Sequence, residues 1–450
     1  MTHDKPVTGS IIDINPSIFF RFNRLDLAIK LIYAEAVKTN SKSTYPRNIY
    51  RKHLFSITGG NGKFIEYGNS PPKIGFSQFE EVFVSLIKGC PRDFPPVSID
   101  SDFRLTNGAH RAVAGFINGQ SVSAILDGKP RNILADYNFF RSAHTLRHHL
   151  GREDLDHALL KLCSINPNIQ VLIVYPSMRN KLLLAEIRSH PDFFLERSFR
   201  LNPKAKFKLL EFLYPNNENF VNLTPENNYI AYRDRFNAPG KVRVFFFETH
   251  ETIMLKKLKS NLRNRYKLLN GAIHTPDTFE ETIELLEVLL IKNSRKHIQD
   301  FDLEYARTLR GKLKNLHAAS PERLVVGSSS LALIGIRIPR DLDIVSYSHV
   351  VESLDSKIDM HTQYWLNRGF NVDELIDNPR GYIKIYGTKY VSIGNLTKFK
   401  LKRHERKDMR DICLILRLEV KRFMSFSYIA VHFTKGYLRI FRDSFLREAR

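Results

Sequence analysis

The spacing of apolar and polar residues over the first 150 positions predicts a small unit of helices and strands. Residues 21–37 and 77–89 carry apolar side chains at intervals of three and four, the pattern of a helix with one buried face. Residues 103–119 then predict a strand, a turn at Asn-Gly and a helix that ends at a glycine. We therefore expect a first domain over residues 1–150.

The middle of the chain alternates continuous apolar runs with amphipathic segments. Residues 169–177 and 242–249 are rich in β-branched and aromatic side chains, which is typical of strands buried on both faces. Thr278, followed three residues later by Glu281, predicts the start of a helix. This alternation predicts a second, α/β domain over residues 151–320. Further helices are expected at 179–190, 202–215 and 251–270.

The third expected domain, residues 321–450, opens with the most informative stretch of the sequence. An apolar strand ends at Gly327-Ser328, a helical segment follows, and a second strand carries Asp341 and Asp343. Strand alternation puts both carboxylates on one face, about 7 Å apart at Cα. Such a pair can hold Mg²⁺ or Mn²⁺ on the phosphates of a nucleotide. The glycine would let a phosphate approach the backbone, and the serine with the amides of the next helix would cradle it.

This arrangement resembles the nucleotidyltransferase superfamily, in which an apolar strand ends in Gly-Gly or Gly-Ser and an Asp-x-Asp pair follows on a later strand. It is most similar to the abortive-infection nucleotidyltransferase toxins, which carry an arginine shortly before the pair, as Arg337 and Arg340 stand here. The resemblance implies a mixed sheet flanked by helices. It also implies metal-dependent transfer of a nucleotidyl group from an NTP to a hydroxyl or phosphate acceptor. The aspartate pair would be catalytic and bind the metal, while the two arginines and the Gly-Ser turn would bind the nucleotide.

Residues 395–419 predict a single helix with one basic face. In the resembling families a helix of this form lies beside the phosphate site. By that resemblance Lys400, Arg403 and Lys407 contact the triphosphate, and Lys400 is catalytic. Asp408 or Asp411 pairs with one of these basic residues. A solvated basic face is the alternative. The residues that share the face are Lys400, Arg403, Lys407 and Asp411.

Many members of these families supply a third carboxylate from a later strand. The later strand expected here, residues 381–393, offers Lys384 and Lys389 but no acid. The base would then lie elsewhere, or the acceptor would need little activation, or the fold would be kept without transfer chemistry. Three acids close by in sequence are expected on a helix or loop: Asp373, Glu374 and Asp377.

A second candidate phosphate site lies in the N-terminal domain, at Asn107, Gly108, His110 and Arg111. Positive side chains beside the free amides of a helix start favour an anion. The turn is similar to that of the ParB/sulfiredoxin fold, whose relatives bind nucleotide or phosphate there. Sulfiredoxins carry a catalytic cysteine where this chain has Ala109, so reduction of a sulfinic acid is not expected. The alternative is that the histidine caps its helix or satisfies a buried carbonyl.

The charge balance indicates an anionic partner. The chain has 69 Lys+Arg against 47 Asp+Glu, a net charge of +22, which favours nucleic acid, nucleotide, a phosphorylated glycan precursor or an acidic membrane face. A generally basic surface is the alternative. The three cysteines, Cys90, Cys163 and Cys413, lie far apart, which fits a reducing cytoplasm better than a disulfide framework.

The sequence thus favours a cytoplasmic, Mg²⁺- or Mn²⁺-dependent nucleotidyltransferase with two phosphate-handling modules. Its acceptor would be a phosphorylated small molecule, a surface-glycan precursor, an RNA or a protein. Two alternatives stay open: a non-catalytic nucleotide- or nucleic-acid-binding regulator, and a phosphotransferase centred on the N-terminal module. No apolar run reaches the length of a membrane span. The aromatic and basic last thirty residues leave peripheral membrane contact open.

Overall fold

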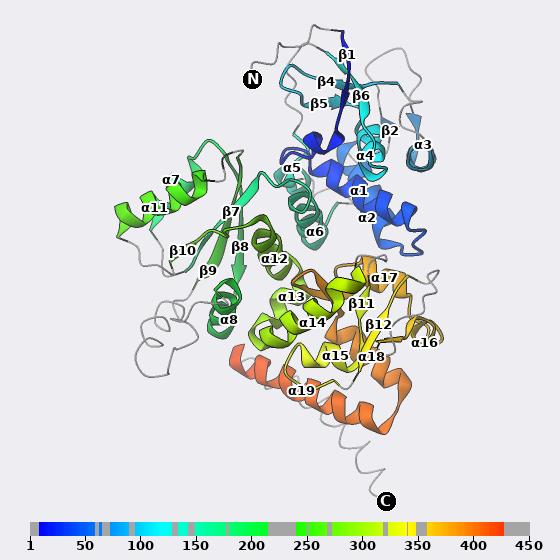
Figure 1. The fold of residues 1–450 in the computed structure, drawn as a ribbon, viewed down its shortest axis with the longest axis vertical. Helices are drawn as coiled ribbons and strands as arrows, with labels where there is room; N and C mark the ends of the chain where they lie inside the picture. Colours follow the sequence, from blue (N-terminus) through cyan, green and yellow to red (C-terminus); the bar gives the residue numbers. More distant parts are fainter. Residues whose placement is uncertain are drawn as a thin grey trace, which may run out of the picture.

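The protein is a mixed α/β structure, in which sheets of four, four and five strands lie among helices (Figure 1). A two-stranded ribbon pairs β2 (Lys63–Phe64) with β3 (Lys73–Ile74). The computed structural model describes residues 9–58, 63–64, 73–89, 95–127, 134–142, 149–176, 180–214, 240–249, 251, 253–267, 272–317, 323–339, 341–347 and 358–426.

The N-terminal sheet is mixed, because its two inner strands are parallel and both outer strands are antiparallel to their neighbours. Its strands in spatial order are β1 (Ile11–Ile14), β6 (Val122–Leu126), β4 (Val97–Ile99) and β5 (Leu105–Asn107). The helices around it are η1 (Pro16–Phe19), α1 (Leu25–Lys38), α2 (Tyr45–Ile57), α3 (Phe76–Lys88), α4 (Ala109–Ile117) and α5 (Tyr137–Ser142). Helix α1 is central, since it packs on α2, α3 and α4 and is buried along most of its length.

Helix α1 carries charged side chains into this core, and they satisfy one another. Asp26 accepts hydrogen bonds from Arg24 (2.8 Å) and Lys30 (2.9 Å), and all three are buried. Arg24 also donates to the carbonyl of Leu105 on β5. Burial alone would raise the pKa of Asp26, but the two cations hold it far below its ordinary value. The cluster therefore joins α1 to the sheet through paired charges.

The middle sheet is antiparallel throughout, and each of its faces is covered. Phe245 and Phe247 pack with α7 (Lys181–Arg188) and α11 (Met254–Tyr266), whereas Phe246 points into the main core on the opposite face. The predicted burial of these strands on both faces is confirmed, while β8 was not expected from the sequence. The strands in order are β10 (Ile273–His274), β7 (Ile169–Val174), β9 (Lys241–Glu248) and β8 (Phe193–Arg200). The nearby helices are α6 (Arg152–Cys163), α7 (Lys181–Arg188), α8 (Pro203–Leu213), α11 (Met254–Tyr266) and α12 (Phe279–Leu290).

The C-terminal sheet has five strands and a mixed topology. Strand β12 is antiparallel to β11 and parallel to β13, and β11 is parallel to β15. Its order is β13 (Ile358–Met360), β12 (Leu342–Val345), β11 (Leu324–Val325), β15 (Thr388–Val391) and β14 (Tyr382–Ile385). The helices of this part are α15 (Gly327–Ala332), α16 (Thr362–Leu366), α17 (Val372–Asp377), α18 (Ile393–Arg403) and α19 (Arg406–Phe426).

Helical segments connect the middle and C-terminal sheets (Figure 1). Helix α12 begins as the sequence predicted, because the Thr278 hydroxyl accepts a hydrogen bond from the Glu281 amide (3.1 Å) and the Glu281 carboxylate accepts one from the Asp277 amide. The connecting elements that follow are α13 (Lys292–His297), η4 (Ile298–Asp300) and α14 (Leu303–His317).

Helix α17 joins the C-terminal part to the N-terminal part. The Glu374 carboxylate accepts a hydrogen bond from the Thr44 amide (2.9 Å) at the start of α2. Asp373 accepts one from the Lys42 amide (2.6 Å), and Asp377 accepts one from the hydroxyl of Ser41 (2.6 Å). The acids that lie close to the expected catalytic strand in sequence are therefore used to hold the α1–α2 loop.

Each of the three predicted ranges contains one of the larger sheets, but buried apolar residues form a continuous core across them. Division into three domains at 150 and 320 stays a prediction. None of the helices in the described ranges has the length and apolar character that a bilayer span requires. The aromatic and basic stretch after residue 426 lies outside the described residues.

Candidate metal centre

The turn after β11 is shaped by the close approach of a carboxylate. Gly327 has φ +64°, and a Cβ at this position would lie 1.9 Å from Oδ2 of Asp343. The amide of Val326 donates to the Asp343 carbonyl (2.9 Å), which fixes the two segments against each other. Only glycine combines this positive φ with the absence of a Cβ that would overlap the Asp343 carboxylate. The sequence assigned this glycine to a phosphate; the structure gives it a second role, which is to make room for Asp343.

Three potential ligands meet on the neighbouring strands β12 and β13. Asp343 lies directly opposite Asp359 in the register of the two parallel strands. His361 follows two residues later, and its amide donates to the carbonyl of Ile344 (2.9 Å). One ligand atom from each of Asp343, Asp359 and His361 lies within 4.8 Å of the others. The backbone pairing of two strands therefore brings two carboxylates and an imidazole to one point.

The imidazole of His361 is paired with a carboxylate. Its Nε2 atom lies 2.9 Å from Oδ1 of Asp343, the distance of a hydrogen bond or an ion pair. The contact with Asp343 raises the pKa of His361 above its ordinary value; burial opposes this, and the charges of Asp359 and Asp341 add to it. The site thus concentrates negative charge around one nitrogen.

These donors fit a divalent metal ion. Carboxylate oxygens and an imidazole nitrogen are common protein ligands for such ions, and His361 offers its Nε2 atom beside the two carboxylates. Asp341 is exposed just ahead of β12, where its backbone carbonyl accepts a hydrogen bond from the Ser329 hydroxyl (3.2 Å). Among the described residues the group that could share an ion contains Asp343 but not Asp341. Metal binding by Asp341 stays a prediction.

The additional carboxylate comes from a strand that the sequence interpretation missed. The hairpin β14–β15, which was expected to supply it, instead carries lysines that pair elsewhere. Lys384 forms an ion pair with Glu287, and Lys389 donates to the carbonyl of Ile376. Asp359 stands in the short run Ile-Asp-Met on β13. An acid between two apolar residues was the signal that could have identified this strand.

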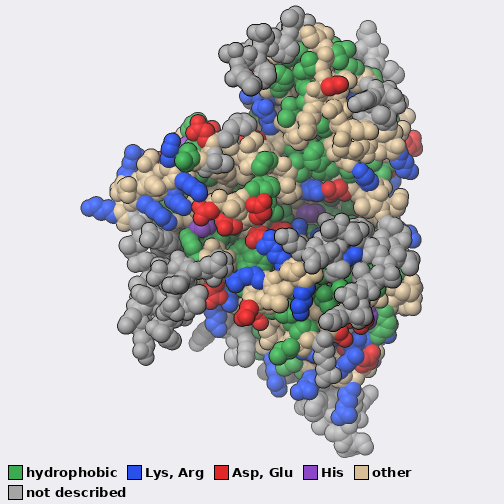
Figure 2. All heavy atoms as spheres, in the orientation of Figure 1, with side chains coloured by type: hydrophobic (Ala, Val, Ile, Leu, Met, Phe, Trp, Pro, Cys, Tyr) green, Lys and Arg blue, Asp and Glu red, His purple; other side chains and the backbone are tan. Residues whose placement is uncertain are grey.

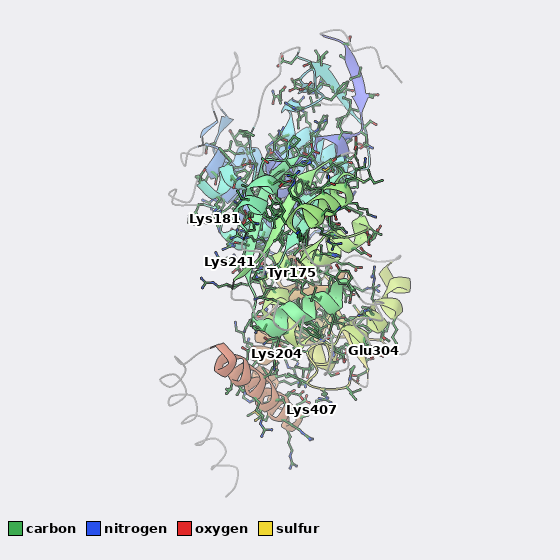
Figure 3. The ribbon with its side chains drawn as sticks, turned by 90° about the vertical axis from the view of Figure 1, so that its left-hand side faces the viewer. Tyr175, Lys181, Lys204, Lys241, Glu304 and Lys407 are labelled. Carbon is green, nitrogen blue, oxygen red and sulfur yellow. The ribbon has the colours of Figure 1, made fainter. Side chains whose placement is uncertain are left out.

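The predicted basic helix at 395–419 is in fact two helices, and the prediction of one continuous helix was wrong. His404 adopts φ +56° and ends α18, so α19 begins in a new direction at Arg406. Lys407 consequently does not share a face with Lys400. Its side chain is 58% exposed and pairs with Glu405, and it lies on α19 at the lower end of the molecule (Figure 3).

The two helices are joined by a buried ion cluster. The ammonium group of Lys400 donates to Asp408 (3.1 Å) and Asp411 (2.7 Å), and its side chain is 4% exposed. Arg403 donates to Asp408 through Nε (2.6 Å), and Arg337 forms an ion pair with Asp411 (3.1 Å). The expected pairing of an aspartate with a basic residue is thus present. The cluster ties the segment that leads to Asp341 to both helices.

These contacts bear on the residues assigned to the triphosphate. Lys400 and Arg403 already bond to carboxylates, so their charges organise the α18–α19 corner in this structure. Arg337 is partly exposed beside them. Arg340 lies outside the described residues. Contact of Lys400, Arg403 or Arg337 with a nucleotide stays a prediction. The same holds for Ser328.

The N-terminal turn has the predicted backbone, but its side chains bond within the protein. Gly108 has φ +89°, and its amide donates to Oδ1 of Asn107 (2.7 Å). The guanidinium of Arg111 donates to the carbonyls of Pro95 and Pro96. His110 forms a hydrogen bond with the Tyr50 hydroxyl (2.8 Å). These side chains are therefore bonded within the protein, and phosphate binding at this turn stays a prediction.

The resemblance to nucleotidyltransferases stays a prediction from the sequence. Comparisons with known protein families, curated proteins and solved structures found no match. The mixed α/β sheet and the cluster on β12 and β13 are therefore the observations from which a function has to be inferred.

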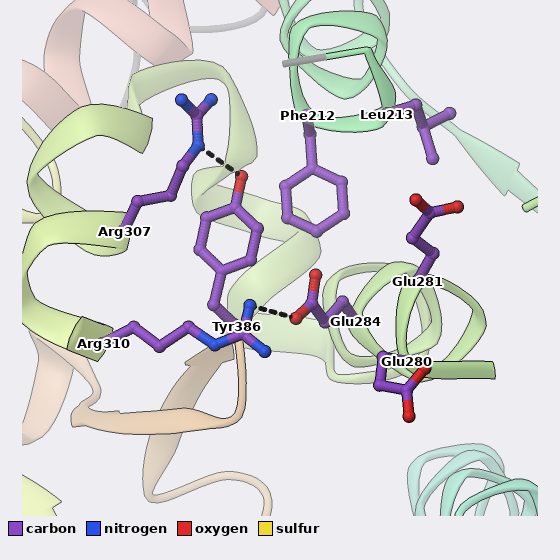
Figure 4. Close-up of a pocket in the computed structure, with 8 residues that line it drawn as sticks. All are labelled: Phe212, Leu213, Glu280, Glu281, Glu284, Arg307, Arg310 and Tyr386. Carbon is purple, nitrogen blue, oxygen red and sulfur yellow. Dashed lines mark hydrogen bonds and ion pairs between the residues drawn. The ribbon is translucent and has the colours of Figure 1, made fainter. Parts of the chain in front are cut away.

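A cavity of about 280 Å³ lies among α8, α12, α14 and the β14–β15 turn. Both of its arginines are bonded within it: Arg310 to Glu284, and Arg307 to the Tyr386 hydroxyl (3.2 Å), as Figure 4 shows. Of the residues singled out in the sequence, the capping residue Glu281 lines it, and none of the predicted nucleotide- or metal-binding residues does. The lining residues are Phe212, Leu213, Glu280, Glu281, Glu284, Arg307, Arg310 and Tyr386.

Proposed function

We propose that this protein is a divalent-metal-dependent nucleotidyltransferase that moves a nucleotidyl group from an NTP to a hydroxyl or phosphate acceptor. One observation carries the proposal: Asp343 and Asp359 lie opposite each other on adjacent strands, and Asp343 also lies against the glycine of the Gly-Ser turn. A turn suited to a phosphate and a carboxylate pair suited to its metal are thereby joined in one corner.

The residues of this corner have distinct roles in the proposal. Asp343, Asp359 and His361 would hold the ion, with Asp341 as a further ligand at the start of β12. When bound, the ion would neutralise the phosphate oxygens of the NTP and favour attack on the transferred phosphorus. Asp343 is held in place by its backbone bond to Val326. The ion cluster around Lys400 would keep Arg337 close to the phosphates, since Arg337 is paired with Asp411.

A second candidate function is a non-catalytic regulator that binds nucleic acid. The net charge of +22 favours it, and Figure 2 shows Lys and Arg side chains over the part formed by α7 and α11. Several of these cations are paired, however, as Lys256 is with Asp277 and Arg265 with Glu186. Paired surface charges attract a polyanion less strongly, so this candidate ranks second.

The deciding experiment is incubation with each of the four labelled NTPs, a divalent ion and RNA or protein acceptors, followed by measurement of pyrophosphate release. We expect Asp343→Asn and Asp359→Asn to lower the rate at least about 100-fold, the equivalent of several kcal/mol of transition-state stabilisation. Asp102→Asn is the matched control, because Asp102 is an exposed acid of the N-terminal part. Circular dichroism would show that each variant folds.

Three outcomes would count against the proposal. Turnover that survives in both Asp variants would remove the metal centre from the reaction. Activity lost only in His110→Ala would favour a phosphotransferase centred on the N-terminal module. Salt-sensitive binding of nucleic acid without any turnover would favour the regulator.

A further inference from the structure

The ligand set on β12 and β13 contains a nitrogen, which sets it apart from an all-carboxylate magnesium site. Mg²⁺ is a hard ion that takes oxygen ligands and keeps several waters. Imidazole is a ligand of the first-row transition ions, whose affinities rise from Mn²⁺ towards Cu²⁺. His361 places such a nitrogen 2.9 Å from a carboxylate oxygen of Asp343. The choice of ion at this site therefore depends on whether His361 is a ligand.

The contact between His361 and Asp343 has the spacing of two neighbouring metal ligands. Two adjacent ligand atoms on an octahedral ion with bonds of about 2.1 Å lie about 3 Å apart, which matches this contact. In the metal-free protein the same contact pairs the imidazole with the carboxylate, and a bound ion would take the place of the proton between them. The spacing suits a small divalent ion, and the nitrogen decides which one.

The imidazole is also held in position from its outer side. His361 precedes α16, and its amide is bonded to β12 through Ile344. Its ring packs edge-on against Tyr364, with the centroids 5.7 Å apart. The guanidinium carbon of Arg368 lies 3.6 Å from the centroid of the same tyrosine ring. A ring fixed by backbone and aromatic contacts is pre-oriented for coordination.

We infer that Asp343, Asp359 and His361 form a centre for a first-row transition ion of the Mn²⁺-to-Zn²⁺ series, and that His361 makes the centre prefer such an ion over Mg²⁺. The inference deepens the proposed function, on which it rests for the use of the ion. It concerns binding, however, so it can be measured without turnover.

The test uses the full-length protein freed of metal. Co²⁺ binding is followed by its visible absorption, Mn²⁺ binding by the loss of the electron paramagnetic resonance signal of free Mn²⁺, and Mg²⁺ binding by competition with Mn²⁺. We expect the unchanged protein to bind Co²⁺ and Mn²⁺ more tightly than Mg²⁺. His361→Asn should weaken Co²⁺ binding at least about tenfold, since even residues that only support a ligand change affinity by 10–100-fold. Mg²⁺ binding should change less than about threefold.

Two further variants make the result specific. His361→Asp replaces the nitrogen by oxygen, so we expect it to retain Mg²⁺ binding and to lose the preference for Co²⁺. His404→Asn is the matched control, because His404 is exposed in the same part of the chain and has φ +56°, a conformation that asparagine tolerates. It should leave all three affinities unchanged.

The inference is overturned if His361→Asn binds Co²⁺ as tightly as the unchanged protein, or if the unchanged protein prefers Mg²⁺. In that case loss of pyrophosphate release in Asp343→Asn would still support the proposed function. Conversely, Co²⁺ binding that depends on His361, in a protein that transfers no nucleotide with any ion, would support the centre and overturn the proposed function.

Discussion

Two strand–turn–helix segments of this chain look alike in sequence and differ in what surrounds them. Gly108 and Gly327 each follow a strand, have positive φ and lie at the start of a helix. At Gly108 a side chain would meet Val97, 2.8 Å from Cγ1, and Nη2 of Arg111 at 3.0 Å. At Gly327 it would meet the carboxylate of Asp343. One glycine makes room for a valine and a guanidinium group, and the other makes room for a carboxylate.

The polar residues of the two segments follow the same division. His110 and Arg111 bond to a tyrosine hydroxyl and to two backbone carbonyls. Asp343 and Asp359 instead lie together, with His361 as the basic group beside them. The local pattern predicted an anion site at both turns. What distinguishes them is whether the tertiary contacts satisfy the charges that the turn presents.

The Lys400 cluster sharpens this comparison with the largest expected effect. Its charges are buried and mutually paired, so it should support the fold. Lys400→Met should lower the free energy of unfolding by about 3 kcal/mol, because it removes the cation that two buried carboxylates share and leaves each of them with one arginine. Lys407→Met, at an exposed residue paired with Glu405, should change it by no more than about 0.5 kcal/mol. Urea denaturation measures both.

The pH dependence of the same cluster has a definite sign. Burial alone would raise the pKa of Asp408, but hydrogen bonds from Arg403 and Lys400 outweigh it and hold that pKa below the ordinary value of 3.8. This stabilisation is present above pH 3.8 and is lost as the pH falls below it.

A Lys400→Met variant that unfolds like the unchanged protein but no longer binds NTP would instead assign the lysine to the triphosphate.

The two glycines themselves provide the next test. Gly327→Ala and Gly108→Ala should each lower stability by about 1–3 kcal/mol, because both force a side chain into the left-handed region. Gly327→Ala should in addition weaken divalent-ion binding at least about tenfold, since its methyl group displaces the Asp343 carboxylate. Gly108→Ala should leave ion binding unchanged. Equal loss of ion binding in both variants would remove the distinction between the two turns.

The sequence predicted local features well and the partners of those features poorly. The cap at Thr278, the buried strands β7 and β9 and the strand that ends at Gly327 all follow from side-chain periodicity and capping chemistry, which act over a few residues. Strand β8 alternates apolar with polar residues, and it was missed. The left-handed residue His404 interrupts a pattern that otherwise continues as one helix.

The candidate metal centre was predicted only in part, for a different physical reason. Asp343 was identified from its own strand, whereas Asp359 and His361 join it only because β13 pairs in parallel with β12. Strand order in a sheet depends on the packing of the whole domain, and periodicity within one segment carries no information about it. An acid that becomes a ligand through a neighbouring strand therefore looks like any surface acid in the sequence.

Two histidines extend the comparison with the smallest effect. His361 lies among carboxylates, whereas His53 packs on Tyr50, the residue that bonds to His110. The contact with Asp343 raises the pKa of His361 above 6.5, while burial lowers the pKa of His53 well below it. His53 also accepts a hydrogen bond from the ammonium of Lys30 (3.3 Å), which requires a neutral imidazole.

The signs of their contributions to stability are therefore opposite. In the metal-free protein, the stabilisation from His361 is complete below pH 6.5 and is lost as the pH rises through its raised pKa. His53 acts the other way, because below pH 6.5 the unfolded chain binds a proton that the folded protein does not, so stability falls as the pH falls. Imidazole signals in NMR spectra, assigned with His361→Asn and His53→Gln, should show the first group titrating above pH 6.5 and the second remaining neutral well below it. If both titrated near 6.5, neither the burial of His53 nor the carboxylates beside His361 would affect the protonation of these side chains. The two histidines would then give no support to the difference between the two regions.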